Sequence, residues 1–257
     1  MAERSRKPIV LWTTLSALAV AGVYVLAAYV VEIPDWGEPI ARYVITVGLP
    51  ATLRVSAIAV VGSTLIGITL GTLLTIDWWP SRVLIRFYVE VFRGLPILVT
   101  VFIVYFGLPA ISASLKFDPL TATAIALTLW GSAQVAEATR GAVQSIPREQ
   151  HEAAAALGFG WAGSHGFVIL PQALRRLLPP LVSLLVNIIQ NSTLAAAIGG
   201  VELLTAAKSQ SERLTFFPPA GIGEIHAFEV FAGLMVIFFL ISFPLTRLAA
   251  VLEKRLV

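Results

Sequence analysis

The most restrictive feature of the sequence is a series of long apolar runs, of which the first, Val10–Val31, is 22 residues without a charge. At about 1.5 Å per residue, a helix of that length crosses a hydrocarbon core of roughly 30 Å. Lipid offers the backbone no hydrogen-bond partners, so these runs must be helical. Charged residues make up 13% of the chain, against about 25% in soluble domains. The sequence therefore predicts an all-α, polytopic membrane protein.

Five further runs predict membrane spans: Val55–Ile76, Leu95–Leu115, Leu120–Ala136, Leu177–Val201 and Val230–Thr246. The fourth and sixth spans are short, and we expect their helices to continue past the flanking charges. Basic residues before Val10–Val31 also fit a signal peptide, but the run exceeds a usual h-region and the sequence before Glu32 is a poor cleavage site. We therefore expect residues 1–31 to be retained as a span.

The distribution of basic residues predicts the orientation. With six spans and a cytoplasmic N-terminus, thirteen Lys and Arg residues lie on the cytoplasmic side and five outside. This positive-inside bias predicts that both termini and the loop 141–176 are cytoplasmic. The outer segment Glu202–Glu229 begins with a predicted amphipathic surface helix, Glu202–Arg213, followed by an ordered loop. Because the basic residues form no run, they indicate membrane topology and no nucleic-acid partner.

The loop 141–176 is too long for a simple hairpin and has helical signals of its own. Pro147 suits a first helical turn, and Gln150–Leu157 has high helix propensity. Gly158 is placed to end this helix, and a second short helix is predicted over Trp161–Leu170 before Pro171 redirects the chain. Two helices joined by a glycine turn could dock in a cleft of another protein, or rest on the membrane surface.

The same loop resembles the EAA loop of ABC-importer permeases, which reads Glu-Ala-Ala, three residues, Gly, nine residues, Ile-x-Leu-Pro. The matching positions are Glu152, Ala153, Ala154, Gly158, Leu170 and Pro171, with Val168 where isoleucine is usual. Four further stretches resemble the polar amino-acid permease branch: Tyr88–Pro96, Ala136–Pro147, Leu170–Pro180 and Asn191–Leu194. The resemblance covers the chain from about Thr46 to the C-terminus.

This resemblance implies a five-helix type I importer core in residues 46–257, preceded by an added N-terminal helix and outer loop in residues 1–45. The loop would be the coupling helix that seats in a cytoplasmic ATPase dimer, with Glu152 facing a basic residue and Gly158 forming the turn. ATP and Mg would bind to that ATPase, because this sequence has no Gly-x-x-x-x-Gly-Lys-Ser/Thr loop and holds no cofactor itself. Further implied partners are an extracytoplasmic solute-binding protein on the Glu202–Glu229 side, a second copy or similar permease, and membrane lipid. The implied location is the bacterial cytoplasmic (inner) membrane.

Polar residues inside the predicted spans are candidates for a substrate path. They are Ser132, Gln134, Asn187, Gln190, Asn191 and Thr193. Asn187, Gln190 and Asn191 share a helical face by their i, i+3, i+4 spacing. Buried amides are costly unless they meet protein or water, so this face predicts either a substrate path or a hydrogen-bonded helix seam. Cation-transporting relatives often carry an acid at the position of Asn191, which disfavours a cationic substrate here.

Other polar and small residues have structural interpretations. The pairs Glu137–Arg140 and Glu90–Arg93 have helical spacing and are predicted to be structural ion pairs. Ser63, Gly67 and Gly71 form a small-residue ridge, which predicts close helix packing and is also compatible with dimerisation. The chain has no cysteine, and its three histidines, expected as solvated loop residues, lack metal-ligand spacing.

No nucleophile–base constellation is evident, so the chain is predicted to be a transport subunit and not an enzyme. The favoured function is the permease subunit of an ATP-driven ABC importer for a polar amino acid. The alternatives are an ABC permease for another small solute, such as an opine or a sulfur compound, or a secondary carrier driven by an ion gradient. Neither a carrier nor an intramembrane enzyme would need the EAA spacing.

Overall fold

The computed structural model describes residues 36–76, 78–216 and 226–256, and every regular element in these ranges is a helix. The elements are α2 (Gly37–Tyr43), the π-helical turn η1 (Val44–Gly48), α3 (Leu49–Leu73), α4 (Trp79–Gly94), α5 (Ile97–Phe102), the π-helical turn η2 (Ile103–Gly107), α6 (Leu108–Ile111), the 3-10 turn η3 (Ala113–Leu115), α7 (Pro119–Gln144), α8 (Arg148–Ala156), α9 (Trp161–Gly163), the π-helical turn η4 (Ser164–Ile169), α10 (Leu170–Asn191), the 3-10 turn η5 (Ser192–Ile198), α11 (Leu203–Phe216) and α12 (Ala227–Leu256).

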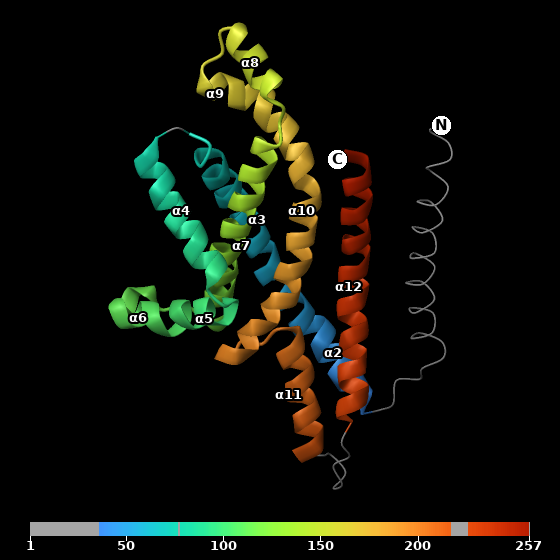
Figure 1. The fold of residues 1–257 in the computed structure, drawn as a ribbon. Coiled ribbons are helices and arrows are strands. Elements are labelled where there is room, and N and C mark those ends of the chain that lie inside the picture. Colours follow the sequence, from blue (N-terminus) through green and yellow to red (C-terminus); the bar gives the residue numbers. More distant parts are fainter. Residues whose placement is uncertain (1–35, 77, 217–225, 257) are drawn as a thin grey trace, which may run out of the picture.

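Helix α7 is the centre of the fold, with α3, α4, α5 and α10 packed against it (Figure 1). It starts at Asp118, whose carboxylate accepts hydrogen bonds from the amides of Leu120 and Thr121. The side chain of Thr121 and these amides hold the pKa of Asp118 below its ordinary value. Along α7, Leu127, Ala133 and many other residues are fully buried, so its small and polar side chains meet protein more than lipid.

The small-residue ridge of α3 packs directly on α7. Ser63, Gly67 and Gly71 are all buried, and a Cβ added at Gly67 would overlap the side chain of Val135. The prediction of close helix packing is therefore confirmed, with α7 of the same chain as the partner.

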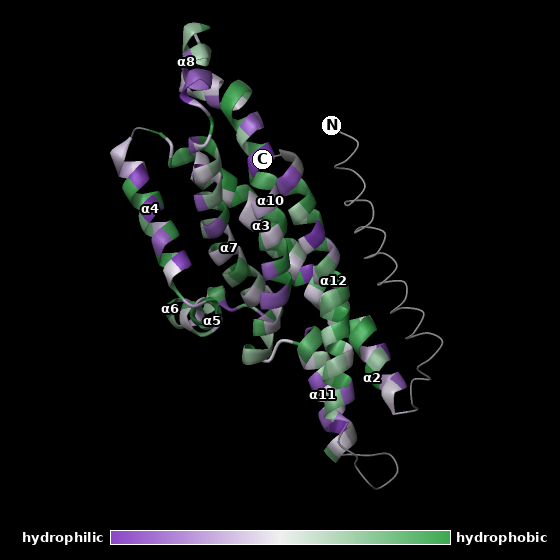
Figure 2. Cartoon of the chain, turned by 45° about the vertical axis from the view of Figure 1, so that its right-hand side comes forward, coloured by the Kyte–Doolittle hydropathy of each residue, from purple (hydrophilic) through white to green (hydrophobic). Residues whose placement is uncertain are grey.

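Within the described residues, three helices are long and apolar enough to cross a membrane: Gly37–Leu73, Trp161–Ile198 and Ala227–Lys254. They contain most of the predicted second, fifth and sixth spans. The predicted fourth span is helical within α7, which is less apolar. Both α7 and α12 extend well past the short runs Leu120–Ala136 and Val230–Thr246, as expected. Figure 2 shows hydrophilic residues on α8 and along α4, whereas α12 is mostly hydrophobic. The first predicted span lies outside the described residues.

The predicted third span, Leu95–Leu115, is helical over Ile97–Ile111, but it is a candidate span only together with the preceding helix, α4. The segments Trp79–Gly94 and Ile97–Ile111 meet at 108°. Leu95 is extended because it precedes Pro96, which disfavours helical geometry for the residue before it. Consequently α4 runs along the bundle, and α5 and α6 lie crosswise at the end of α4 that is farther from residues 148–169 (Figure 1).

Residues 148–169, called the knob below, project from one end of the bundle, and α11 lies at the opposite end (Figure 1). The predicted amphipathic helix after Glu202 is present as α11, but it is more than a surface helix. Leu203, Ala206 and Ala207 are buried in a cluster with residues of α2, η1 and α12. The predicted loop after α11 lies mostly outside the described residues.

Buried Glu202 caps α11, a role that the sequence analysis missed. Its carboxylate oxygens accept hydrogen bonds from the amides of Leu204 (2.8 Å) and Thr205 (2.9 Å). Burial raises the pKa of the Glu202 carboxyl, and these hydrogen bonds oppose the rise. The capping pattern was in the sequence, but its complete burial depends on the packing of α11.

Candidate functional site

The knob is built around a glycine turn that the sequence predicted. Helix α8 ends at Ala156, and Gly158, two residues later, turns the chain with a left-handed φ of +81°. The amide of Gly158 bonds to the carbonyl of Ala155 (2.9 Å), and the amide of Phe159 to that of Ala154 (3.1 Å). These bonds satisfy the last carbonyls of α8 and turn the chain into α9.

The expectation that Pro171 redirects the chain is wrong. Pro171 lies in the first turn of α10, where a missing amide hydrogen is tolerated. Helices α9, η4 and α10 with η5 form one continuous helix, Trp161–Ile198. The part of the knob from Trp161 onward therefore belongs to the same continuous helix as Asn187 and Gln190.

A buried histidine anchors the knob to the bundle. The Nδ1 atom of His165 lies 3.0 Å from the carbonyl oxygen of Trp161 and its Nε2 atom 3.2 Å from the hydroxyl of Thr75, at the end of α3. The carbonyl can only accept, so Nδ1 carries a proton. The ring also stacks on Trp161, with centroids 4.2 Å apart. The expectation of solvated histidines is thus wrong for His165, because its partner on α3 is remote in sequence.

The EAA residues divide between exposed and buried positions. The side chain of Glu152 is 67% exposed and pairs with Arg148 of the same helix (3.2 Å). Such an exposed pair contributes little to stability. Ala153 and Pro171 are exposed, Leu170 is half-buried, and Ala154 packs inward at 1% exposure. The carboxylate of Glu152 is therefore available to a partner.

The tip of the knob is apolar. Large hydrophobic side chains are exposed on the turn and on the following helix: Leu157, Phe159, Trp161 and Phe167. Leu157 and Phe167 are 76% and 77% exposed. Several large exposed apolar side chains on one turn and the helix that follows it are typical of a protein-interaction site.

Two of the six candidate path residues meet in one pocket. A pocket of about 350 Å³ between α7 and α10 is lined by Gln134 and Asn187, together with Trp130 and Ser183. The two amides come from different helices, so the tertiary fold brings them together.

The other four candidates lie elsewhere. Ser132 is buried toward α4, where its hydroxyl lies 2.6 Å from that of Tyr88. Asn191 donates from Nδ2 to the carbonyl of Asn187 (2.8 Å), and Thr193 donates to that of Gln190 (2.7 Å). Gln190 is exposed. These residues do not line the pocket between α7 and α10.

The predicted ion pairs are confirmed only in part. Arg140 donates from Nε to Glu137 (3.1 Å), as expected. Glu90, however, pairs with Arg86 (2.9 Å) and not with Arg93. Both spacings are helical, so the sequence alone could not choose between them.

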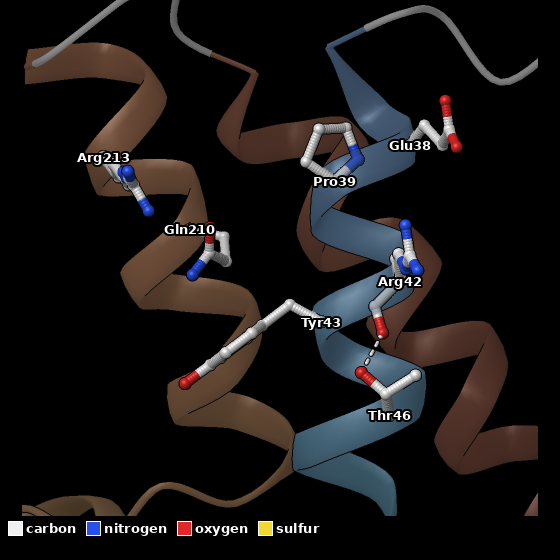
Figure 3. Close-up of a pocket in the computed structure, with 7 residues that line it drawn as sticks. All are labelled: Glu38, Pro39, Arg42, Tyr43, Thr46, Gln210 and Arg213. Carbon is white, nitrogen blue, oxygen red and sulfur yellow. Dashed lines mark hydrogen bonds between the residues drawn. The ribbon is translucent and has the colours of Figure 1, made fainter.

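A second pocket lies at the end of the bundle opposite the knob. It has a volume of about 460 Å³ and lies between α2 with η1 and α11. In Figure 3, Gln210 and Arg213 project from α11 toward α2, and Tyr43 projects toward α11. The charged residues of its lining are Glu38, Arg42 and Arg213. In the described parts of the chain, no group of three or more His, Asp or Glu residues could hold a metal ion.

Comparison with known families identifies the kind of protein that has this architecture. The family described as "Binding-protein-dependent transport system inner membrane component" matches residues 63–257. The chain belongs to this family. The matched region of this inner membrane component begins within α3 and includes the knob and the pocket between α7 and α10.

Relatives and solved structures agree with this assignment. The chain is 32% identical to the "Probable glutamine ABC transporter permease protein GlnM" of Bacillus subtilis, and the match covers 81% of this chain and 91% of that protein. It is 34% identical to the "Glutamine transport system permease protein GlnP" of Escherichia coli K12, with the same coverage. These relatives are permease subunits, which are transport components.

The fold resembles two solved transporters. One is an amino acid ABC transporter, at 27% identity and a TM-score of 0.72 over 88% of this chain and 99% of that one. The other is the MetNI methionine ABC transporter, at 17% identity and a TM-score of 0.67 over 86% of this chain and 99% of that one. The second likeness supports the fold alone.

Proposed function

We propose that the chain is the permease subunit of an ATP-driven ABC importer that takes up a polar amino acid from an extracytoplasmic binding protein. The observation that carries the proposal is the continuous helix Trp161–Ile198. It joins the knob, with its exposed docking surface, to the pocket that contains Gln134 and Asn187. Movement of the knob would therefore be transmitted to the pocket without an intervening flexible segment.

The partners follow from this arrangement. The EAA residues of the knob and of the start of α10 (Glu152, Ala153, Ala154, Gly158, Leu170 and Pro171) would couple to a dimer of ATPase subunits, which bind ATP and Mg. The apolar tip would seat in a groove of the ATPase, and Glu152 would pair with a basic residue there. The end that carries α11 and the pocket of Figure 3 would face the binding protein. A second copy or a similar permease would complete the membrane assembly.

The proposed topology has six spans with both termini in the cytoplasm. Residues 46–257 would form the type I importer core of five spans, in which the bent pair α4 and α5–α6 counts as one span and α7 as another. Residues 1–45 would add the N-terminal span and an outer loop. The bias of basic residues toward the knob end supports this orientation.

The substrate class is inferred from the relatives and the pocket. The two relatives described above are named as glutamine permeases, and one of the two similar solved structures is an amino acid ABC transporter. Gln134 and Asn187 present neutral amides, which can both donate and accept hydrogen bonds. Such groups suit a polar, uncharged side chain.

The function is tested by purification and reconstitution. Affinity purification of the chain from native membranes in mild detergent should recover an ATPase with a phosphate-binding loop. In proteoliposomes, this complex should take up glutamine only when ATP and the binding protein are present. Uptake driven by an ion gradient without ATP would instead identify a secondary carrier, and binding-protein specificity for an opine or a sulfur compound would identify another solute.

The pocket between α7 and α10 makes a separate prediction. Replacing Asn187 with alanine should raise the substrate KM for uptake about fivefold, which corresponds to the loss of one hydrogen bond of about 1 kcal/mol. The yield of the assembled complex should stay unchanged, because Asn187 is exposed and its side chain packs in no core cluster. Gln190→Ala, on the same helix but outside the pocket, is the control. Equal KM values for the two variants would remove the pocket from the substrate path.

A further inference from the structure

A third pocket lies beside the knob and has a different chemistry. Its volume is about 690 Å³, and it is bounded by the end of α3, the start of α4, the end of α7 and the knob. The charged or titratable residues of its lining are Arg82, Arg86, Arg140, His151 and His165. Among the described residues that line it, none is acidic. The pocket is therefore suited to an anion.

Two carboxylates outside the lining hold two of the three arginines, Arg86 and Arg140, in place. Glu137 pairs with Arg140 and approaches Arg86 (3.6 Å), while Glu90 pairs with Arg86 (2.9 Å). Pairing of this kind orients guanidinium groups before a ligand arrives. Because an arginine presents several N–H donors in one plane, it can keep such a pair and still contact a phosphate.

The position of the two α4 arginines relates the pocket to the membrane. Arg82 and Arg86 are one turn apart, next to the face on which Ile85 and Val89 are buried. On their other side, α4 exposes large apolar residues: Val83, Leu84 and Phe87, with exposures of 58%, 70% and 68%. The arginines thus lie on the border between the packed face of α4 and an apolar face suited to lipid.

Two tryptophans indicate the depth of this border. Trp78 and Trp79, at the start of α4, are 62% and 73% exposed. Exposed tryptophans of membrane proteins concentrate at the level of the lipid headgroups. Arg82 follows Trp79 by one turn, which places its side chain within reach of the phosphate layer.

We propose that this pocket binds the phosphate group of an anionic lipid headgroup. The guanidinium groups of Arg82, Arg86 and Arg140 would hold the phosphate, and Leu84 and Phe87 would contact the acyl chains. Basic pockets between membrane helices are known sites for such headgroups. The assignment of the lipid to the cytoplasmic leaflet rests on the membrane orientation given under the proposed function. The affinity of the pocket for an anion does not depend on that orientation.

The site would connect the lipid to the coupling element. His151, Trp161 and His165 line the pocket from the knob, and the arginines line it from α4 and α7. A bound anion would bridge the two sides and stabilise the attachment of the knob to the bundle. A soluble phosphate compound has the same chemistry, so the experiment must separate the two sources.

The first arm of the test measures lipid retention. The complex is purified with its partners, placed in nanodiscs of phosphatidylcholine with or without phosphatidylglycerol, and analysed for bound lipid by native mass spectrometry. Wild type should retain phosphatidylglycerol, and Arg86→Gln should retain it about tenfold more weakly, the size of one lost charge-assisted hydrogen bond. Arg86→Lys should restore part of the retention.

Arg93→Gln is the matched control, because Arg93 is an exposed arginine on the same helix that does not line the pocket. It should retain phosphatidylglycerol as wild type does. Equal retention by Arg86→Gln and Arg93→Gln would count against a lipid ligand.

The second arm titrates glycerol phosphate into the complex in phosphatidylcholine nanodiscs by calorimetry. Binding that is lost in Arg86→Gln, without an effect on lipid retention, would assign the same phosphate site to a soluble ligand. If neither lipid retention nor glycerol phosphate binding distinguishes Arg86→Gln from Arg93→Gln, the proposal is overturned. Both arms measure binding alone. Their results could therefore still be interpreted if the proposed transport function proved wrong.

Discussion

Replacing Gly71 with alanine is expected to destabilise the bundle by about 2–3 kcal/mol, the upper part of the range for overpacking a tight core. The added Cβ would overlap the backbone carbonyl oxygen of Ala136 and lie 2.6 Å from the Cβ of Thr139. Neither atom can move away by a change of rotamer, so α3 and α7 would have to separate. Thermal unfolding of the purified protein in detergent should show a clear fall in the midpoint.

Gly233→Ala provides the matched control for this experiment. Gly233 lies within helix α12, and no heavy atom is within 4 Å of its added Cβ. Alanine also has the higher helix propensity, by about 0.8–1 kcal/mol. The midpoint of this variant should therefore stay the same or rise. Equal midpoints for the two variants would show that the α3–α7 contact tolerates separation and would contradict the packing described above.

Replacing Glu152 with alanine is expected to weaken attachment of the ATPase about 30-fold or more. Truncating one partner of a charge pair that becomes buried on binding costs about 2–5 kcal/mol. Within the chain itself, Glu152 pairs only with the exposed Arg148 in the part that the structure describes, so the variant should insert and fold normally. Titration of ATPase onto the immobilised permease, followed by ATP-driven uptake, measures both effects.

Glu149→Ala is the control for Glu152→Ala. Glu149 is also exposed and lies on α8, one turn earlier, but outside the EAA positions. This variant should bind the ATPase with little change. If Glu152→Ala and Glu149→Ala bind and transport equally, Glu152 has no role in coupling, although the apolar tip could still dock.

The helices of the core and the turn of the knob could be predicted closely from the sequence. Gly158 turns the chain after α8 as expected, because a left-handed residue is a local requirement that glycine meets without strain. The run Leu95–Leu115 was predicted to cross the membrane as a span because hydrophobicity does not show in which direction a helix runs. The bend at Pro96 was visible in the sequence, but its 108° angle was not.

The candidate site was also predicted only in part from the sequence. The six amide and hydroxyl residues were chosen from their position in apolar runs, and only Gln134 and Asn187 line one pocket. Ser132 instead faces Tyr88 of α4. The rotation of α7 about its axis decides between these environments, and that rotation follows from the contacts of many residues with α3, α4 and α10.

The helical membrane character of this protein, the place of most of its helices and the turn of the knob could all be read from the sequence. These properties depend on the length of apolar runs and on local backbone preferences, which neighbouring residues settle. The contact of His165 with Thr75, the pairing of Glu90 with Arg86 and the pocket that three arginines share with the knob became visible only in the folded structure. Those relations join segments far apart in the chain, and they arise from how packed helices are rotated and bent against one another.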